Sequence, residues 1–271
     1  MLLEVKNLNI EFYDTDPPEK AVKGISFSME QGEILGIVGE SGSGKTQTAL
    51  SILQLLKSNS GISSGEILFK GKNLAGLSGR ELQKIRGKEI SMIFQEPMTS
   101  LNPVLTVGRQ VEEGLKLHGE GFSKEQRKAK ALDALGEAGL PDPEGIYGKY
   151  PHQLSGGMRQ RVMIAAALVT EPELLIADEP TTALDVTVQA QILELLKEIN
   201  AKHGTSILFI SHDLEVIRKL CGRVLVMNQG VVVEEGEVSR VFDHPQKDYT
   251  KKLLAAIPDR RRSLRKRRRS Q

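Results

Sequence analysis

Residues 39–46 read Gly39-Glu40-Ser41-Gly42-Ser43-Gly44-Lys45-Thr46 and match the pattern G-x-x-x-x-G-K-[ST]. The apolar run ILGIV precedes this segment, and the helical run TQTALSILQLL overlaps its end. Glycines in such a loop let backbone N–H groups surround phosphate oxygens at a helix N-terminus. Lys45 would supply positive charge to the β- and γ-phosphates, and Thr46 a hydroxyl to Mg²⁺. The segment therefore predicts a nucleotide-binding loop, and the flanking strand and helix argue against a chance match in a glycine-rich turn.

Short apolar runs and helical patterns alternate outward from this loop. Runs that suit strands buried on both faces of a parallel sheet occur at Leu2–Lys6, Ile34–Gly39, Ile90–Gln95, Leu174–Asp178, Ser206–Ser211 and Val224–Asn228. Helical patterns occur at Lys45–Leu56, Lys124–Gly139, Gly157–Val169 and Val186–His203. The alternation predicts an α/β fold with ligand sites at the carboxyl ends of the strands.

Two regions depart from this alternation. The segment from about residue 98 to 154 has no convincing strand and several helical stretches, including Val107–Leu117. It predicts an inserted helical subdomain, which we extend to about residue 165. Val22–Met29 and Glu66–Lys70 resemble antiparallel strands joined by glycine-containing turns and predict an antiparallel β subdomain.

Composition and charge exclude several classes of protein. The chain has 271 residues and a net charge of +2, with a single cysteine, Cys221, which excludes an internal disulfide framework or a multi-cysteine metal site. No run of 18 apolar residues predicts a membrane span. Residues 260–269 read RRRSLRKRRR and carry eight basic side chains. Such a run predicts a solvated, disordered tail, with attraction to anionic lipid or nucleic acid as the alternative.

A second motif, which is acidic, follows the run Leu174-Leu175-Ile176-Ala177. Here an apolar strand ends in Asp178 and Glu179, which would lie beside the phosphate loop. Neighbouring residues of a strand point to opposite sides, so the two acids can take different roles. We expect Asp178 to hold the Mg²⁺ shell and Glu179 to face the attacking water. A solvated acid at a strand end is the plainer interpretation, and the phosphate loop favours the catalytic one.

Residues 154–161 read Leu154-Ser155-Gly156-Gly157-Met158-Arg159-Gln160-Arg161 and open a predicted helix. This segment resembles the signature sequence of the ATP-binding subunits of ABC transporters, with Met158 where many members have Gln. The resemblance implies that Ser155, Gly156 and Gly157 approach the γ-phosphate held by the opposite subunit. A helix N-terminus led by these residues is an anion site, and Ser155 also suits an ordinary N-cap.

Three further residues match this family in order. Gln95 resembles the Q-loop glutamine that senses Mg²⁺ and water, Asp185 the D-loop aspartate that faces the other subunit, and His212 the switch histidine near the γ-phosphate. Taken singly, Gln95 also suits a surface amide, Asp185 the N-cap of the next helix, and His212 a loop or cap residue.

The family usually stacks adenine on an aromatic residue before the phosphate loop. Leu8, Ile10 and Phe12 alternate along one face of a predicted strand, and Tyr13 follows. The register favours Phe12 as the stacking residue, with Tyr13 second. Packing of Phe12 into the core is an almost equal alternative.

The segment Gln95-Glu96-Pro97-Met98-Thr99-Ser100-Leu101-Asn102-Pro103 resembles the branch that serves oligopeptide, dipeptide and nickel importers, as does the late segment from Asp243 to Pro258. The resemblance implies a P-loop NTPase (RecA-like) core within residues 1–258, binding ATP and Mg²⁺, with a basic tail at 259–271. It implies ATP hydrolysis coupled to uptake of peptides or nickel. Many members of the branch carry a cysteine-rich stretch with an iron–sulfur cluster after that final proline. Arginines follow it here, so we expect no cluster.

The resemblance also implies partners and a location. These are a second ATPase subunit, the same or a paralogous chain, in a head-to-tail dimer, two membrane permease subunits that contact the segment near Gln95–Val107, and an extracytoplasmic substrate-binding protein. The expected location is peripheral, at the cytoplasmic face of the cell membrane, without nucleic acid. The alternative is a soluble ABC-type ATPase acting on ribosomes or nucleic acid, favoured only by the basic tail. A generic P-loop kinase or GTPase would have no need of the segment from Ser155 to Arg161.

Overall fold

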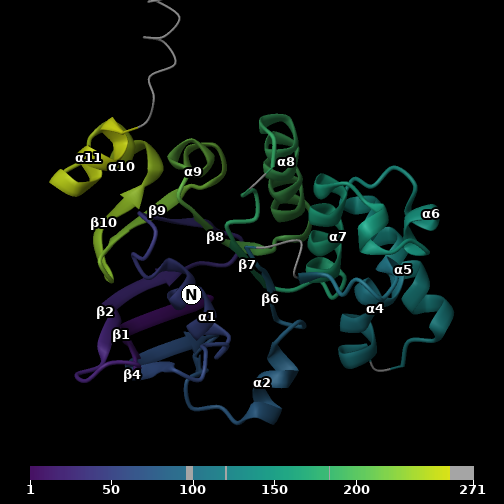
Figure 1. Cartoon of the computed structure of the whole chain (residues 1–271), viewed down its shortest axis with the longest axis horizontal. Coiled ribbons are helices and arrows are strands. Elements are labelled where there is room, and N and C mark those ends of the chain that lie inside the picture. The colour runs from purple at the N-terminus through teal and green to yellow at the C-terminus, as the bar shows by residue number, and fades with distance from the viewer. Residues whose placement is uncertain (96–99, 120, 183, 257–271) are drawn as a thin grey trace, which may run out of the picture.

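The computed structural model describes residues 1–95, 100–119, 121–182 and 184–256 (Figure 1). Within these ranges the strands form two sheets. One has six strands in the order β10-β9-β3-β8-β7-β6, and the other four in the order β2-β1-β4-β5. Three parts of the predictions lie outside the described residues: residues 96–99 of the segment Gln95–Pro103, residue 183, two positions before Asp185, and the tail at 259–271.

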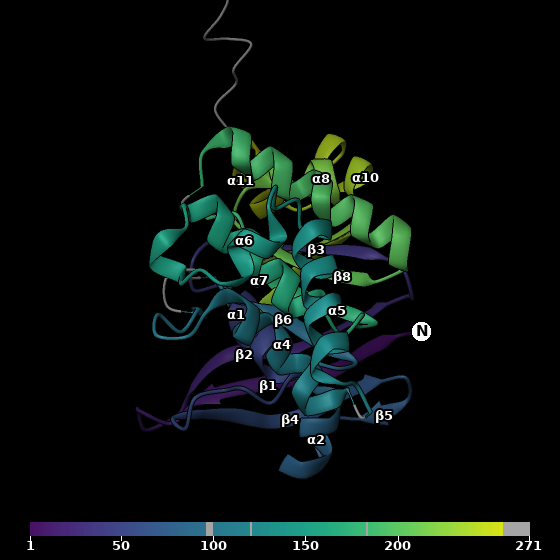
Figure 2. The ribbon, with the colours of Figure 1, turned by 90° about the vertical axis from the view of Figure 1, so that its right-hand side faces the viewer.

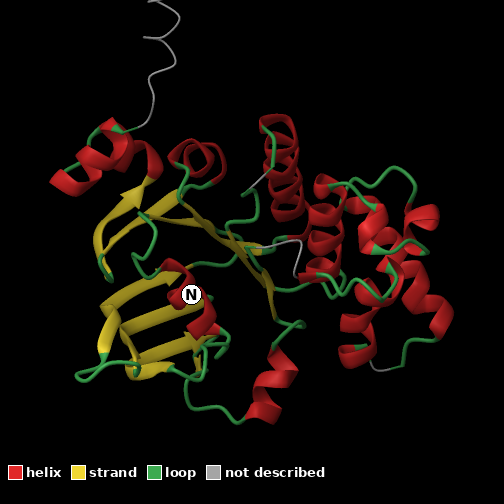
Figure 3. Cartoon of the chain, viewed as in Figure 1, coloured by secondary structure: helices red, strands yellow, loops and turns green. Residues whose placement is uncertain are grey.

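The strands are β1 (Leu3–Phe12), β2 (Glu19–Met29), β3 (Ile34–Val38), β4 (Ser60–Phe69), β5 (Lys72–Asn73), β6 (Ile90–Ile93), β7 (Leu174–Asp178), β8 (Ser206–Ser211), β9 (Arg223–Asn228) and β10 (Val231–Glu237). The helices are α1 (Lys45–Ile52), α2 (Gly79–Ile85), α4 (Val107–His118), α5 (Lys124–Glu137), α6 (Pro143–Tyr147), η1 (Pro151–Gln153), α7 (Gly156–Leu168), α8 (Val186–His203), α9 (Leu214–Leu220), α10 (Val238–Asp243) and α11 (Asp248–Ala255). Figure 3 shows the two sheets in yellow and the helices in red.

The six-stranded sheet lies between two hydrophobic clusters. Because side chains alternate along a strand, Leu174 and Ile176 of β7 enter the cluster shared with β1, β2, β4 and α1. Leu175 and Ala177 of the same strand enter the cluster shared with α7, α8 and α9. Strands β9, β3, β8, β7 and β6 run parallel, and β10 is antiparallel to β9. Burial on both faces explains why the five parallel strands are nearly continuous apolar runs, whereas β10 at the edge is partly exposed and ends in acidic residues.

The assignment of Leu2–Lys6 to the parallel sheet is wrong. This run belongs to β1, which pairs antiparallel with β2 and β4. Its side chains alternate between burial and exposure: Leu3 and Val5 are buried, whereas Lys6 is exposed. Such alternation is typical of an antiparallel sheet with one solvated face.

Other predicted boundaries differ by a few residues. Helix α1 ends at Ile52 rather than Leu56, because Gln54 has a φ of 51°, which no α-helix continues. Strand β4 begins at Ser60, six residues before the predicted start at Glu66. The residues between these two positions are mostly polar and show no alternation of apolar residues. Helix α8 spans Val186–His203, as predicted. Strands β5 and β10 and helices α2, α9, α10 and α11 were not predicted.

Helices α4, α5, α6 and α7 pack together on the side of the molecule opposite the antiparallel sheet (Figure 1). Figure 2, turned by 90°, shows them in front of the six-stranded sheet. Buried side chains from this group, such as Val111, Leu135 and Val162, join the cluster on that face of the sheet. The helical subdomain therefore shares a hydrophobic core with the parallel sheet.

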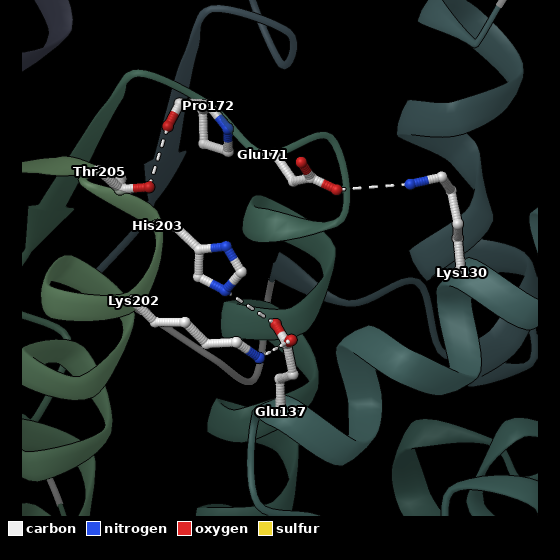
Figure 4. A network of polar contacts seen from close by, with 7 residues as sticks. All are labelled: Lys130, Glu137, Glu171, Pro172, Lys202, His203 and Thr205. Atoms are coloured by element: carbon white, nitrogen blue, oxygen red, sulfur yellow. Dashed lines mark hydrogen bonds and ion pairs between the residues drawn. The ribbon is translucent and has the colours of Figure 1, made fainter.

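Polar contacts join the helical subdomain to the end of α8 (Figure 4). Glu137, the last residue of α5, accepts a bond from Lys202 Nζ at 2.6 Å and lies 3.2 Å from His203 Nε2. A second contact joins α5 to the loop before β7: Nζ of Lys130, two turns earlier on α5, lies 3.4 Å from Oε1 of Glu171. The hydrogen bond from Lys202 and the nearby His203 hold the pKa of Glu137 below its ordinary value.

We expect Glu137→Gln to lower the melting temperature by about 1–2 °C at pH 7, since exposed ion pairs contribute little stability. The pKa of this carboxyl is depressed in the folded state. Its stabilisation is therefore present above the ordinary glutamate pKa of 4.5 and is lost as pH falls through the folded pKa. Thermal unfolding at pH 7 and pH 4 checks this. Glu194→Gln, whose partner Lys197 lies on the same helix, is the control. A difference between variant and wild type that does not shrink at low pH would contradict the prediction.

Candidate nucleotide-binding site

The loop at residues 39–46 connects β3 to α1 and is held close to other backbone segments. A Cβ at Gly39 would lie 2.1 Å from the backbone oxygen of Met227 in β9. Gly44 has a φ of 99°, and a Cβ there would lie 2.8 Å from the oxygen of Ala21 in β2. These two positions accept only glycine, because a side chain would push the loop off both sheets. The loop therefore follows a fixed path into the first turn of α1.

Lys45 lies inside this loop and is buried. Its Nζ donates to the backbone oxygens of Gly39 at 2.8 Å and Glu40 at 2.9 Å. Burial lowers the pKa of Lys45, and the nearby carboxylates of Glu179 and Asp178 oppose that shift. The hydroxyl of Ser43 is also buried, without a hydrogen-bond partner in the described part of the chain. A buried cation and an unpaired hydroxyl in a glycine loop fit the phosphates of a nucleotide.

Asp178 ends β7 next to Thr46, whose hydroxyl donates to its Oδ1 at 3.3 Å. Burial raises the pKa of Asp178 to about 6, while the Thr46 hydroxyl and Lys45 lower it. The described residues hold no group of three or more His, Cys, Asp or Glu side chains able to bind a metal. Hydroxyl and carboxylate oxygens at this spacing fit Mg²⁺, which takes few protein ligands and completes its shell with water and phosphate oxygens.

Glu179 is the centre of a polar cluster. Its Oε2 lies 3.1 Å from Gln95 Nε2, 2.9 Å from Thr182 Oγ1 and 3.0 Å from His212 Nδ1. Its side chain is 12% exposed, so the carboxylate is partly shielded yet reachable by water. The prediction that Asp178 and Glu179 are neighbouring residues of one strand is wrong for Glu179. Strand β7 ends at Asp178, and Glu179 has a φ of 47°.

The sheet order explains why residues so distant in sequence meet. Strands β3, β8, β7 and β6 are parallel neighbours, so their carboxyl ends lie at one edge of the sheet. The loop follows β3, His212 follows β8, and Gln95 lies two residues beyond β6. The structure thus brings together Lys45, Thr46, Asp178, Glu179, Gln95 and His212. Sequence analysis did not assign Thr182 to the site. Its position three residues after Glu179 was the signal that could have indicated a contact between the two side chains.

The other predicted residues lie on two helix N-termini and on β1. Ser155 caps α7 through a bond to Met158 N at 3.3 Å, and Asp185 caps α8 through bonds to Thr187 N and Val188 N at 3.0 Å each. Ser155 and Gly156 are exposed, and a Cβ at Gly157 would lie 2.9 Å from Val188. Within the described residues, no hydrogen bond joins Ser155, Gly156 or Gly157 to the loop at 39–46.

The two aromatic candidates for adenine stacking lie at the end of β1. Phe12 is the last residue of the strand and is half-buried, outside both core clusters. Tyr13 follows it and is 52% exposed. Both side chains are accessible, so the choice between them stays a prediction.

The C-terminal part of the chain supports the loop from two sides. The N–H of Gly230, in the turn between β9 and β10, donates to Ser43 O at 3.1 Å. The N–H of Glu40 donates to the hydroxyl of Tyr249, on α11, at 3.3 Å. Sequence analysis assigned neither residue to the site.

A sequence profile of the ABC transporter family matches residues 22–182, which is more than half of the chain. The oligopeptide transport ATP-binding protein OppD of Bacillus subtilis is 53% identical over 258 residues, covering 95% of this chain and 72% of that protein. The chain belongs to the ABC transporter family.

Further similarities agree with this membership. The dipeptide transport ATP-binding protein DppD of Escherichia coli is 47% identical to this ABC transporter chain, covering 95% of this chain and 79% of that protein. An ATP-binding cassette solved as a dimer, in a post-hydrolysis state bound to ADP and Pi, superposes with a TM-score of 0.79. It is 33% identical and covers 88% of this chain and 99% of that one. The fold is therefore that of an ABC ATPase: a P-loop NTPase core with an antiparallel β subdomain and an inserted helical subdomain. The chain is an ATPase.

For this ABC ATPase, Lys45→Ala should weaken nucleotide binding about 10- to 100-fold, because hydrogen bonds to charged groups contribute about 1.5–3 kcal/mol. Turnover should fall with binding. Titration with a fluorescent ATP analogue measures the affinity, and thermal unfolding checks that the variant is folded. Lys84→Ala, an exposed lysine on α2, is the control. Unchanged affinity in Lys45→Ala would mean that nucleotide binds elsewhere.

Proposed function

We propose that this chain is the ATP-hydrolysing subunit of an ABC importer that takes up dipeptides or oligopeptides. The observation that carries the proposal is the identity of about 50%, over almost the whole chain, to proteins named for oligopeptide and dipeptide transport. Nickel, the other cargo suggested by the sequence, has no support among these relatives. The findings also give no support to a soluble ABC-type ATPase acting on ribosomes or nucleic acid.

The proposed site binds the triphosphate of ATP in the loop at 39–46. Backbone N–H groups of the loop and Lys45 bind the phosphates, and Phe12 or Tyr13 stacks on adenine. Thr46, Asp178 and Gln95 hold the Mg²⁺, which when bound neutralises charge on the phosphates. The support for these roles is the proximity of the Thr46 hydroxyl to Asp178 and of Gln95 to Glu179.

In the proposed reaction, Glu179 orients and polarises the attacking water. His212 lies 3.0 Å from the same carboxylate and stabilises charge on the phosphoryl group together with Lys45. The N–H of Gln95 and the hydroxyl of Thr182 also donate to Glu179 and hold its side chain in one orientation. Catalysis then consists mainly of positioning and electrostatic stabilisation.

We propose that the complete site needs a second ATPase subunit, the same or a paralogous chain, placed head to tail. Ser155, Gly156 and Gly157 of one subunit would contact the γ-phosphate bound by the other, with Asp185 beside the subunit boundary. Two features support this arrangement. Ser155 and Gly156 are exposed at the start of α7, and Val186, next to Asp185, is 66% exposed. The relative with bound ADP and Pi was itself solved as a dimer.

A groove beside Gln95 is the proposed contact for a permease subunit. It has a volume of about 320 Å³ and lies between the end of α1, the end of β6 and α7. Leu55, Phe94, Leu101 and Met163 are among its lining residues, and Phe94 is 42% exposed. An apolar cytoplasmic segment of a permease would bury Phe94 next to Gln95. This contact would connect the membrane subunit to the residue that bonds to Glu179.

The proposal includes the rest of the importer. Two permease subunits would hold the ATPase subunits at the cytoplasmic face of the cell membrane, and a separate extracytoplasmic protein would deliver the peptide. Across the described residues, no helix combines the length and the apolar character needed to cross a membrane. We propose residues 1–258 as the ATP-binding domain, with the helical subdomain at about 98–165 and a basic tail at 259–271.

The test is reconstitution of the chain in proteoliposomes with two permease subunits and a substrate-binding protein. We expect MgATP-dependent accumulation of a labelled dipeptide or oligopeptide and stimulation of ATP hydrolysis by that peptide. Stimulation by Ni²⁺ and not by peptides would overturn the peptide assignment. Hydrolysis that responds to ribosomes or nucleic acid and not to permeases would overturn the importer assignment.

A further inference from the structure

Tyr249 lies far outside the segments that identify the nucleotide site. It belongs to α11, near the end of the described chain and beyond the residues 22–182 that match the family profile. Its hydroxyl nevertheless accepts a hydrogen bond from the backbone N–H of Glu40, 209 residues earlier in the sequence. The contact lies directly on the nucleotide-binding loop.

The bonded N–H belongs to a peptide unit that also binds Lys45. The N–H of Glu40 and the carbonyl of Gly39 are two ends of one peptide group, and in a trans peptide they point in opposite directions. Lys45 Nζ donates to that carbonyl at 2.8 Å, and Tyr249 accepts from the N–H at 3.3 Å. The Gly39–Glu40 peptide is therefore held between the ammonium group of Lys45 and the hydroxyl of Tyr249. Rotation of this peptide would break both bonds.

The position of Tyr249 is itself fixed by the core. Its ring packs against the hydrophobic cluster shared with α8 and α9. Glu234 of β10 accepts from the N–H groups of Gln246 at 2.8 Å and Lys247 at 3.2 Å, which anchors the start of α11. Burial raises the pKa of Tyr249, so its phenol is neutral at physiological pH, and its oxygen accepts the bond from Glu40 through a lone pair. A rigid support of this kind can hold the peptide in one orientation.

We propose that Tyr249 is a positioning residue of the nucleotide site, acting on Lys45 through the Gly39–Glu40 peptide. Lys45 has three N–H donors, and the loop carbonyls of Gly39 and Glu40 use two of them. With the peptide held, the third donor is directed to the phosphates. Helix α11 thus belongs to the support of the nucleotide site. The inference rests on the proposed role of the loop at 39–46 in binding ATP.

The test compares Tyr249→Phe with wild type in the full chain. The substitution removes one oxygen and keeps the ring that packs in the core. Loss of a single neutral hydrogen bond predicts a Kd for a fluorescent ATP analogue that rises about threefold to tenfold. The melting temperature should stay near that of wild type. Amide hydrogen exchange at Glu40 should become faster. Tyr150→Phe, which removes a tyrosine hydroxyl in the helical subdomain, is the matched control and should leave the Kd unchanged.

A double-mutant cycle separates positioning of Lys45 from general loosening of the structure. In the Lys45→Ala background, Tyr249→Phe should add no further rise in Kd, because the group it positions is absent. An unchanged Kd in the single variant would overturn the inference, as would an equal rise in both backgrounds. A wild-type chain that binds no nucleotide would instead refute the proposed site itself. Normal nucleotide binding by wild type with no effect of Tyr249→Phe would refute only this inference.

Discussion

Glu179→Gln should reduce the rate of ATP hydrolysis by about 10²- to 10⁴-fold, the usual contribution of a general base. The substitution keeps the shape of the side chain and removes the charge that polarises water. Gln95, Thr182 and His212 all direct polar atoms at Oε2 of Glu179, so the effect is centred on one carboxylate oxygen. ATP should still bind, because the loop at 39–46 is unchanged. The ATP-bound dimer should then accumulate.

Steady-state phosphate release, nucleotide affinity and size-exclusion chromatography with MgATP measure these three outcomes. Glu215→Gln, which changes a glutamate three residues after His212, is the control and should keep normal turnover. Near-normal hydrolysis by purified Glu179→Gln, in an assembly where wild type is active, would refute the catalytic role of Glu179.

Ser155→Arg should abolish hydrolysis and leave ATP binding by the monomer intact. Ser155 is exposed at the N-terminus of α7, a helix of 13 residues, and has no hydrogen bond to the nucleotide loop within the described residues. In the proposed dimer it meets the γ-phosphate bound by the other subunit. A bulky cation there would replace a small hydroxyl and cover the helix N-terminus. The defect should therefore appear only when two subunits meet.

The substitution also removes a helix cap, which costs about 1 kcal/mol of stability. Ser123→Arg removes the same kind of cap from α5 and is the matched control, with hydrolysis expected to persist. In a mixture of Ser155→Arg and Lys45→Ala subunits, mixed dimers hold one doubly defective site and one intact site. Activity should return in part when one intact site turns over alone. Full hydrolysis by Ser155→Arg on its own would remove the basis for a site shared between subunits.

Local chemistry made several features readable from the sequence alone. The loop at 39–46 is a contiguous motif, and its flanking apolar run and helix need no distant contact to be recognised. The N-caps at Ser155 and Asp185 depend only on residues two or three positions along the chain. Helix α8 was predicted with its observed bounds from its helical pattern. In the structure Asp185 caps its start, and Gly204, with a φ of 68°, ends it.

Sheet membership depended on partners far along the chain. The run Leu2–Lys6 was assigned to the parallel sheet from its three apolar residues, although polar residues already alternate with Leu3 and Val5. Its pairing with β2 and β4 places it in the antiparallel sheet, which has one solvated face. The left-handed backbone of Glu179 could not be predicted either. The sequence Asp178-Glu179 is the same whether both acids lie on the strand or the second lies just beyond its end. The fold turns Glu179 toward Gln95 and His212, whereas Asp178 meets Thr46.

The sequence by itself therefore determined the chemistry of the chain: a phosphate loop, its acidic partners and a family whose activity is ATP hydrolysis. Only the tertiary structure decided which distant side chains act on that chemistry. Glu137 of the helical subdomain meets Lys202 at the end of α8, and Tyr249 meets the Gly39–Glu40 peptide across 209 residues. A short motif can be recognised in the sequence because its residues contact one another along adjacent stretches of backbone. Contacts such as these form when a hydrophobic core brings elements together, and no local pattern of residues encodes them.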